Sequence, residues 1–300
     1  MTNVPSKDIS SKDIPSIDVS SKDTSSIDIS LITVSTNEAD DLEKCLPSIF
    51  EEEHDFNIEV IVVDNASTDG TRDLLAQYPE VKVLTMTERK GYIENNNIAL
   101  AEAQGRYLLT MNADVVLQPG TLKYMLDFMD QNPDAALGAC RLMFEDGSLQ
   151  LTCRRFPTPM TYLSRLPHFL GWIPGLKRFS NNSQSKRYVM GDYDHRETRT
   201  VDWVISAFFM MRRSVVEEIG PFARNLRQPF YLEDVDWCFR AHVAKYRVYY
   251  VPEVWATHFY RQSSVRGLNR LSFVHLANIL IFFRNNGWSM LRGKHRRHPT

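Results

Sequence analysis

Apolar runs of strand length alternate with helical patterns through the first half of the chain, and this alternation constrains the fold more than any other feature. Segments 29–35 (ISLITVS) and 58–64 (IEVIVVD) are rich in β-branched residues and almost continuously apolar. Such runs are typical of strands buried on both faces of a parallel sheet. Helical patterns separate them, as in right-handed β–α–β crossovers. The sequence therefore predicts an α/β fold with a mainly parallel central sheet flanked by helices.

The same periodicities predict the other elements. Apolar residues recur at helical spacing between Leu42 and Phe50, so we expect a helix there that Pro47 bends or limits. Residues 154–200 have no clear period and are expected to form a variable loop region or an irregular lid. Further strands are expected at 81–86, 106–112, 135–142 and 246–252, and further helices at 69–78, 96–104, 121–130, 214–220 and 271–284.

Three regions differ in composition. Residues 1–28 hold a ten-residue tandem repeat, as in SKDIPSIDVS and SKDTSSIDIS. One Ile or Val at intervals cannot offset the entropy of ordering, so we expect this segment to be disordered. Residues 29–265 form the main domain, and residues 266–300 form an apolar helix with a basic tail. That end can lie in a membrane interface, or it can dock on the core with its tail in solvent.

Composition and charge narrow the class of protein. The 300 residues are 43% hydrophobic and 24% charged, as in a globular chain that buries a sizeable core. A formal net charge of −2 gives no general attraction to nucleic acid. The four cysteines include no CxxC pair, which argues against a zinc ribbon or a disulfide framework. We see no signal peptide and no apolar run long enough to span a bilayer, so we expect a cytoplasmic protein.

Polar residues follow three predicted strands at their carboxyl ends. One such end is ordinary turn chemistry, and Asp64 alone could equally open an Asx-turn. Three at one edge predict a ligand site, because ligands bind outside the carboxyl ends of parallel strands. The residues at these ends are Ser35, Thr36, Asn37 and Glu38, then Asp64 and Asn65, then Asn112, Ala113 and Asp114.

The absence of phosphate-binding loops narrows the type of ligand. No GxGxxG follows the first strand and no GxxxxGK[ST] occurs in the chain. A nucleotide diphosphate bound at this edge would need another way to offset its charge, and a divalent cation is the natural one. Oxygen ligands suit Mg²⁺ or Mn²⁺. Asp114 is placed to hold such an ion, and Asn112 offers a weaker oxygen.

The segment FYLEDVDWCF (230–239) places three acids among aromatic residues, where carboxylates are costly unless their charge is offset. The residues alone leave two interpretations open. The acids can favour the start of a helix, with Asp236 and Arg240 as an i, i+4 pair. Alternatively, the acids belong to the ligand site, with a chemical role that this segment alone does not define.

Taken in order, these stretches resemble the family-2 glycosyltransferases of the GT-A fold, particularly their rhamnosyltransferase-like branch. The resemblance runs from about Ile29 to His258 and includes IEVIVVDNASTDGT, GYIENNNIALAEAQGRYLLTMNADVVLQPGTL and FYLEDVDWCFRAHVAKYRVYYVPEVWATH. It implies a Rossmann-like nucleotide-binding half and inverting transfer of a sugar from a nucleotide sugar. The favoured donor is dTDP-rhamnose, with a UDP-sugar as an alternative. The implied acceptor is a saccharide or lipid-linked saccharide in cell-surface polysaccharide synthesis.

The resemblance also implies roles for individual residues. Asp234 matches the general base, and Glu233 and Asp236 would position it or bind acceptor. Asp114 and His258 match ligands of a Mg²⁺ or Mn²⁺ ion. The other implied contacts are with the donor, through Ser35, Thr36, Asn37, Glu38, Asp64, Asn65, Asn97, Asn112, Ala113 and Asp114, and with the acceptor, through Trp203 and Asp236.

Several positions depart from the family pattern. Thr36 stands where an aromatic residue is usual, Ala113 where proline is frequent, and Ser206 where glycine is common. These departures leave open a catalytically silent nucleotide-sugar-binding or scaffold protein of the same fold. A nucleotidyltransferase would need a Gly-rich basic loop near the first strand, and the sequence has none.

Overall fold

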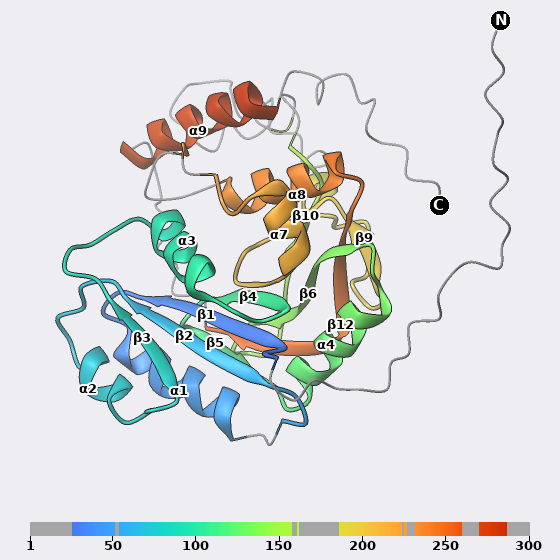
Figure 1. Ribbon diagram of the computed structural model, residues 1–300. Helices are drawn as coiled ribbons and strands as arrows, with labels where there is room; N and C mark the ends of the chain where they lie inside the picture. Colours follow the sequence, from blue (N-terminus) through green and yellow to red (C-terminus); the bar gives the residue numbers. More distant parts are fainter. Residues whose placement is uncertain are drawn as a thin grey trace, which may run out of the picture.

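The described chain forms one ten-stranded mixed sheet with helices on both faces (Figure 1). The computed structural model describes residues 26–51, 54–157, 161, 186–223, 225–226, 232–259 and 270–286. One face carries α3 (Tyr92–Glu102), α7 (Arg213–Ile219), α8 (Glu233–Val243) and α9 (Arg270–Asn286), and the other carries α1 (Ala39–Phe50), α2 (Thr71–Leu75) and α4 (Thr121–Gln131). Each face buries its own apolar cluster, so the sheet divides the core in two.

The amino-terminal half of the sheet is parallel. Its strands lie in the order β3 (Val81–Thr85), β2 (Ile58–Asp64), β1 (Ile29–Ser35) and β4 (Tyr107–Met111). Ile29 pairs with both Ile58 and Tyr107, so strands β1, β2 and β4 start in register. Their carboxyl ends therefore meet at one edge of the sheet, as the apolar runs predict.

The second half of the sheet is mixed. Strand β11 (Phe208–Arg212) runs antiparallel to β4 and to β6 (Ala135–Met143). Strand β12 (Arg247–His258) runs parallel to β6 and antiparallel to β5 (Val115–Leu117). Short strands complete the structure: β7 (Leu149–Gln150) joins β6, β9 (Arg199–Val201) joins β12, and β8 (Cys153–Arg154) pairs with β10 (Trp203–Val204).

The predicted α/β class with helices flanking a large sheet is confirmed. Strands β1 and β2 have the predicted bounds because they are the most continuously apolar runs. Strand β12 is longer than the predicted 246–252, since it continues through Pro252 to His258. Its register against β6 shifts between Val251 and Trp255. An irregularity there accommodates Pro252, which has no N–H for the ladder.

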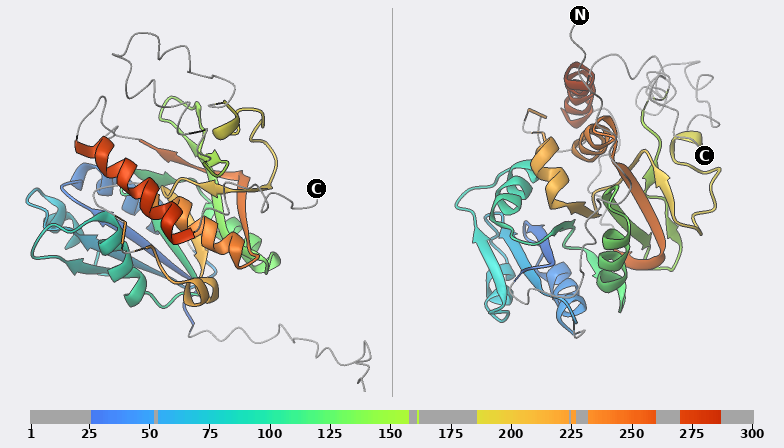
Figure 2. Two further views of the ribbon diagram at one scale, coloured as in Figure 1. Left: turned by 90° about the horizontal axis from the view of Figure 1, so that it is seen from above. Right: turned by 45° about the vertical axis from the view of Figure 1, so that its right-hand side comes forward.

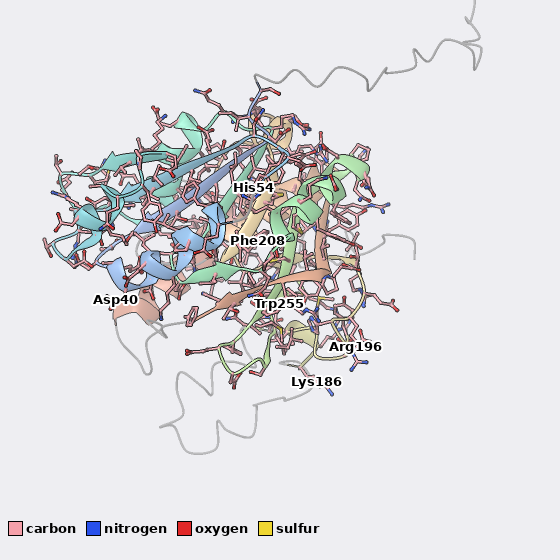
Figure 3. The ribbon with its side chains drawn as sticks, turned by 90° about the horizontal axis from the view of Figure 1, so that it is seen from below. Asp40, His54, Lys186, Arg196, Phe208 and Trp255 are labelled. Carbon is pink, nitrogen blue, oxygen red and sulfur yellow. The ribbon has the colours of Figure 1, made fainter. Side chains whose placement is uncertain are left out.

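The helix predicted around Pro47 forms and buries the expected apolar face. Pro47 lies in the last turn of α1, which ends at Phe50, and the Glu51 N–H donates to the Pro47 carbonyl at 2.8 Å. The helix thus continues through Pro47 and ends three residues after it. Figure 3 shows the face of the sheet that α1 and α4 cover, with the buried Phe208 near its centre.

Helix α9 lies beside α8 (Figure 2). The rings of Phe282 and Phe239 join the two helices with their centroids 5.9 Å apart, while Leu280 is exposed. The described part of this segment thus docks on the core, one of the two interpretations left open. Within the described residues, no helix has the length and apolar character needed to cross a bilayer. The repeat, the middle of the expected lid and the basic tail fall on residues 1–25, 158–160, 162–185 and 287–300, outside the described residues.

Candidate active site

The loops after β1 and β2 are joined by hydrogen bonds at the carboxyl edge of the sheet. The Asn37 N–H donates to Ser67 Oγ at 3.1 Å, and Asn37 Oδ1 accepts from the Thr68 N–H at 2.7 Å. The Asn65 amide donates to Thr36 Oγ1 at 2.9 Å. Asn37 adopts a positive φ of 59°, which asparagine tolerates better than most residues. This network fixes the backbone around which a nucleotide would bind.

Asp64 is fully buried at the end of β2, and both of its oxygens accept hydrogen bonds. Oδ1 accepts from the Ser67 N–H at 2.9 Å, and Oδ2 accepts from Arg72 Nε at 2.7 Å. Burial opposes ionisation, but the hydrogen bonds from Ser67 and Arg72 outweigh it and hold the pKa of Asp64 below its ordinary value. Asp64 is therefore a carboxylate that opens the Ser67 turn. Its predicted contact with the nucleotide stays a prediction.

The ionised state of Asp64 should make folding depend on pH. A folded-state pKa below the unfolded value adds stability above pH ~4 that is lost as the pH falls further. We expect Asp64→Asn to lower the free energy of unfolding by about 1–2 kcal/mol at pH 7, because hydrogen bonds to the charged group are lost. The difference between wild type and variant should shrink towards pH 3. Urea denaturation at both pH values measures it, and an equal difference at both would contradict this assignment.

A turn after β4 brings Asp114 to the end of β12. The Val115 N–H donates to the Asn112 carbonyl, which closes the turn, and Val115 pairs with His258 across the β5–β12 ladder. The Phe259 N–H donates to the Asp114 carbonyl at 2.9 Å. As a result His258 Nε2 lies 3.2 Å from Asp114 Oδ1. The structure thus joins the two predicted metal ligands, although 144 positions separate them in sequence.

The 3.2 Å distance between Asp114 Oδ1 and His258 Nε2 fits a direct hydrogen bond and also fits two ligands on one cation. Neighbouring ligands of an octahedral ion, each about 2.1 Å from it, lie about 3 Å apart. Gln150 Oε1 lies 2.8 Å from His258 Nδ1, so a proton on Nδ1 leaves the Nε2 lone pair facing Asp114. Within the described residues, no group of three His, Cys, Asp or Glu side chains could hold an ion by itself. A cation bound here would draw further ligands from a bound diphosphate or water.

Glu233 and Asp234 begin α8 and are both buried. Leu232, which precedes the helix, has a positive φ of 85°, an unusual conformation for leucine that turns the chain into the helix. Asp234 Oδ1 accepts from the Val235 N–H at 2.8 Å. Burial first, and then the charge of Glu233, raise the pKa of Asp234 well above its ordinary range. Asp234 therefore binds a proton more readily than an ordinary aspartate.

Two segments connect this acid pair to the strand ends. Lys90 exchanges backbone hydrogen bonds with the Asn65 amide, at 2.7 and 3.1 Å, just before Tyr92 begins α3. Burial and then the charge of Glu233 raise the pKa of the Tyr92 hydroxyl, against a hydrogen bond with Ser206. The Asn112 N–H in turn donates to the carbonyl of Ala207, the residue after Ser206. The predicted donor edge and the predicted base thus belong to one connected region.

Three other predicted residues contact protein groups. Asn97 donates to the Phe222 carbonyl at 2.9 Å and accepts from the Phe222 N–H at 3.1 Å. Trp203 Nε1 donates to the Arg155 carbonyl at 3.0 Å. Asp236 forms the expected ion pair with Arg240, at 2.8 Å. Their contacts with donor or acceptor stay predictions, as do those of Ser35, Thr36, Asn37, Glu38, Asn65, Asn112 and Ala113.

Sequence reasoning missed Arg72, Tyr92 and Gln150. Arg72 binds Asp64, and Gln150 contacts His258. Burial, and then the charges of Glu233 and Asp234, raise the pKa of Tyr92. Arg72 could have been inferred from its place eight residues after Asp64, in the first turn of the following helix. Tyr92 and Gln150 give no local signal, because only the folded sheet brings them to the site.

Comparison with known proteins agrees with this geometry. The model of the family described as Glycosyl transferase family 2 matches residues 30–220, more than half of the chain. A putative teichuronic acid biosynthesis glycosyltransferase of Bacillus subtilis, TuaG, is 34% identical over 137 residues, covering 44% of this chain and 54% of its own. The N-acetylglucosaminyl-diphospho-decaprenol L-rhamnosyltransferase of Mycobacterium tuberculosis is 28% identical over 245 residues, covering 77% and 76%. The chain thus spans about half the length of the first relative and three quarters of the second.

Solved structures share the fold. GalNAc-T7 with UDP, GalNAc and Mn²⁺ aligns with a TM-score of 0.62 and 15% identity, covering 87% of this chain and 48% of its own. Residues 1–349 of Staphylococcus aureus TarS with UDP-GlcNAc align with a TM-score of 0.54 and 20% identity, covering 80% and 62%. Both are glycosyltransferases of the GT-A fold. With the family match over residues 30–220, these findings establish that the chain belongs to glycosyl transferase family 2.

Proposed function

We propose that this glycosyltransferase is an inverting, metal-dependent enzyme that uses a nucleotide sugar, with dTDP-rhamnose favoured and a UDP-sugar as the alternative. Its acceptor would be a saccharide or lipid-linked saccharide in cell-surface polysaccharide synthesis. The names of the Bacillus and Mycobacterium relatives support this, since they specify teichuronic acid biosynthesis and rhamnosyl transfer to a diphospho-decaprenol-linked sugar. The Escherichia coli rhamnosyltransferase WbbL is 24% identical over 76% of this chain.

The observation that carries the proposal is the 3.2 Å contact between Asp114 and His258. A carboxylate oxygen suits Mg²⁺ and Mn²⁺ alike, whereas an imidazole nitrogen favours the transition-metal ion Mn²⁺ over the harder Mg²⁺. When bound, the ion would stabilise the charge that develops on the leaving diphosphate. Asp114 and His258 would hold it, and Gln150 would keep the His258 ring turned towards it.

Asp234 would take the proton from the acceptor hydroxyl. Inverting transfer in one displacement needs a base on the face of the sugar opposite the leaving group. A buried carboxylate with a raised pKa suits this step, because it binds the proton more readily than an exposed aspartate. The neighbouring charge of Glu233 contributes to that raised pKa, and it also raises the pKa of the half-buried Tyr92, after burial of the hydroxyl.

The experiment that tests the metal-dependent site is calorimetry of dTDP and UDP binding, with and without Mn²⁺, to wild type and to Asp114→Ala. We expect Mn²⁺ to tighten binding to the wild type, and the tighter nucleotide narrows the donor. In Asp114→Ala this Mn²⁺ effect should be lost, which would weaken binding by roughly tenfold to thirtyfold, equivalent to about 1.4–2 kcal/mol.

The same titrations can also contradict the proposal. Equal affinity with and without Mn²⁺ in the wild type would oppose metal dependence while leaving nucleotide binding intact. No binding of either nucleotide under any condition would favour the silent scaffold. An Asp73→Ala variant, which removes an exposed carboxylate of α2, is the matched control and should bind like wild type.

A peripheral position at the inner face of the cell membrane would suit a lipid-linked acceptor. The cation-rich stretch that would make this contact, residues 287–300, lies outside the described residues. Such a segment binds anionic lipid through its lysines and arginines. Pelleting with anionic liposomes tests the proposal, and equal pelleting with and without that stretch would oppose it.

A further inference from the structure

The first turn of α8 carries a third buried acid, Asp236, and both of its carboxylate oxygens accept hydrogen bonds from other side chains. Oδ2 accepts from Arg240 Nε at 2.8 Å, and Oδ1 accepts from Asn286 Nδ2 at 2.8 Å. Only 1% of Asp236 is exposed. Asn286 is the last residue of α9, so one carboxylate ties the start of α8 to the end of α9.

Arg240 extends this contact to the turn after α7. Its guanidinium donates to the carbonyls of Ile219, Gly220 and Pro221, the last two at 3.1 and 2.7 Å. Trp237 Nε1 also donates to the Gly220 carbonyl, at 3.1 Å. The turn itself needs the positive φ of 84° that Gly220 supplies. Arg240 therefore fixes the outer side of α8 against three consecutive carbonyls.

Phe222, the next residue of that turn, contacts helix α3. Phe222 exchanges two backbone hydrogen bonds with the Asn97 amide on α3. Helix α3 begins at Tyr92. Burial, and then the charges of Glu233 and Asp234, raise the pKa of the Tyr92 hydroxyl. Hydrogen bonds from Asn97, Arg240 and Asn286 thus link helices α3, α8 and α9 around the turn after α7.

The position of Asp236 makes these contacts matter for Asp234. The two residues lie in the same helical turn, two positions apart, so any rotation or shift of α8 moves both. A buried carboxylate that loses its partners leaves an uncompensated charge, which is strongly unfavourable. Of the two partners of Asp236, Arg240 lies on α8 itself, so the bond from Asn286 is the one that links this carboxylate to another helix.

We infer that Asp236 is a positioning residue, through which Asn286 of α9 holds α8 so that Asp234 stays in the geometry of a base. The inference rests on the proposed function for the role of Asp234. Of the two roles left open for Asp236, positioning the base or binding acceptor, it selects the first and assigns the partner in α9. It also gives α9, which lies beyond the family match at residues 30–220, a part in turnover.

The test compares Asn286→Ala with Asn285→Ala. Asn285 is the matched control, since it is the adjacent asparagine of α9 and pairs with the exposed Asn225 at 3.0 and 3.1 Å, away from Asp236. Hydrogen exchange measures the first effect and needs no substrate. We expect Asn286→Ala to raise exchange at least fivefold in residues 232–243 while β1, β2 and β4 stay protected. Asn285→Ala should leave α8 unchanged.

Turnover provides the second measurement, as release of dTDP from dTDP-rhamnose or UDP from UDP-GlcNAc with Mn²⁺. We expect Asn286→Ala to lower kcat about tenfold with little change in donor KM, because a small misplacement of a catalytic group is costly in rate. Asn286→Asp should be worse, since it sets a second carboxylate against Asp236. Asn285→Ala should stay within about twofold of wild type.

The outcomes separate this inference from the proposed function. Unchanged exchange in α8 of Asn286→Ala overturns the inference, whatever the enzyme transfers. Uniformly raised exchange across the sheet also overturns it, because the role would then be general stability. A wild type that releases no nucleotide diphosphate argues against the proposed function, while the exchange result on α8 still stands or falls separately.

Discussion

Asp234→Asn should lower sugar transfer by roughly 10²- to 10⁴-fold, the contribution typical of a general base, and leave nucleotide binding close to wild type. The amide matches the carboxylate in shape and can still accept from the Val235 N–H, but it cannot take the acceptor proton. The variant therefore separates chemistry from binding. Steady-state release of nucleotide diphosphate in the presence of acceptor gives the rate, and calorimetry gives the affinity.

The pH dependence of the wild type gives an independent check on Asp234. A base works only when ionised, and burial beside Glu233 raises the pKa of Asp234 well above its ordinary range. Activity should therefore fall with decreasing pH in a range above that of an ordinary aspartate. The residual activity of Asp234→Asn should lack this acid limb. If the variant keeps both the limb and more than a tenth of the wild-type rate, another group is the base. Asp73→Asn serves as the exposed control.

The largest effect on stability is expected for Gly105→Ala, in the connection between α3 and β4. A Cβ at this position would lie 2.5 Å from the backbone nitrogen of Ser30 and 2.8 Å from the carbonyl carbon of Ile29. These are backbone atoms of the central strand β1, which cannot move aside without disturbing its two neighbours. The Gly105 N–H also donates to Ser30 Oγ at 2.7 Å. We expect a loss of about 3 kcal/mol or more in the free energy of unfolding.

Gly138→Ala is the matched control for Gly105→Ala. A Cβ on Gly138 would meet Met125 Cε at 2.8 Å and Met129 Sδ at 3.1 Å. These atoms belong to flexible side chains that can move, so the loss should be about 1 kcal/mol. Urea denaturation midpoints compare the two variants. Similar losses in both would show that β1 can yield and would contradict the argument from its backbone.

The sequence allowed the parallel half of the sheet to be predicted because its signals are local. β1 and β2 follow from continuous apolar runs, and their polar ends follow from where those runs stop. The bounds of β12 could not be predicted, because Pro252 would normally end a strand and only pairing with β6 carries the chain past it. β5 is three residues long and exists because β12 lies beside it.

The candidate site divides in the same way. Asp114 was predicted from its place after a strand, and the roles of Asp234 and His258 were predicted from the resemblance. The surroundings of these residues include side chains that are distant in sequence. Gln150 contacts His258, and Asn286 donates to Asp236. The charges of Glu233 and Asp234 contribute to the raised pKa of Tyr92, after burial of its hydroxyl. No spacing in the sequence encodes these contacts, because each joins elements that are brought together only by the completed sheet. Asp236 shows the difference, since its ion pair with Arg240 was predictable and its bond to α9 was not.

The place of β12 in the sheet has a consequence for biosynthesis. This strand pairs with β6, β5 and β9, yet it is among the last described segments to leave the ribosome. Until it emerges, β6 and β5 lack the strand that lies between them, and His258 is not yet beside Asp114. Long-range pairing of this kind forms late in folding. A nascent chain released before residue 258 would therefore lack one of the two proposed metal ligands, and under the proposed function such incomplete products would not use a donor sugar.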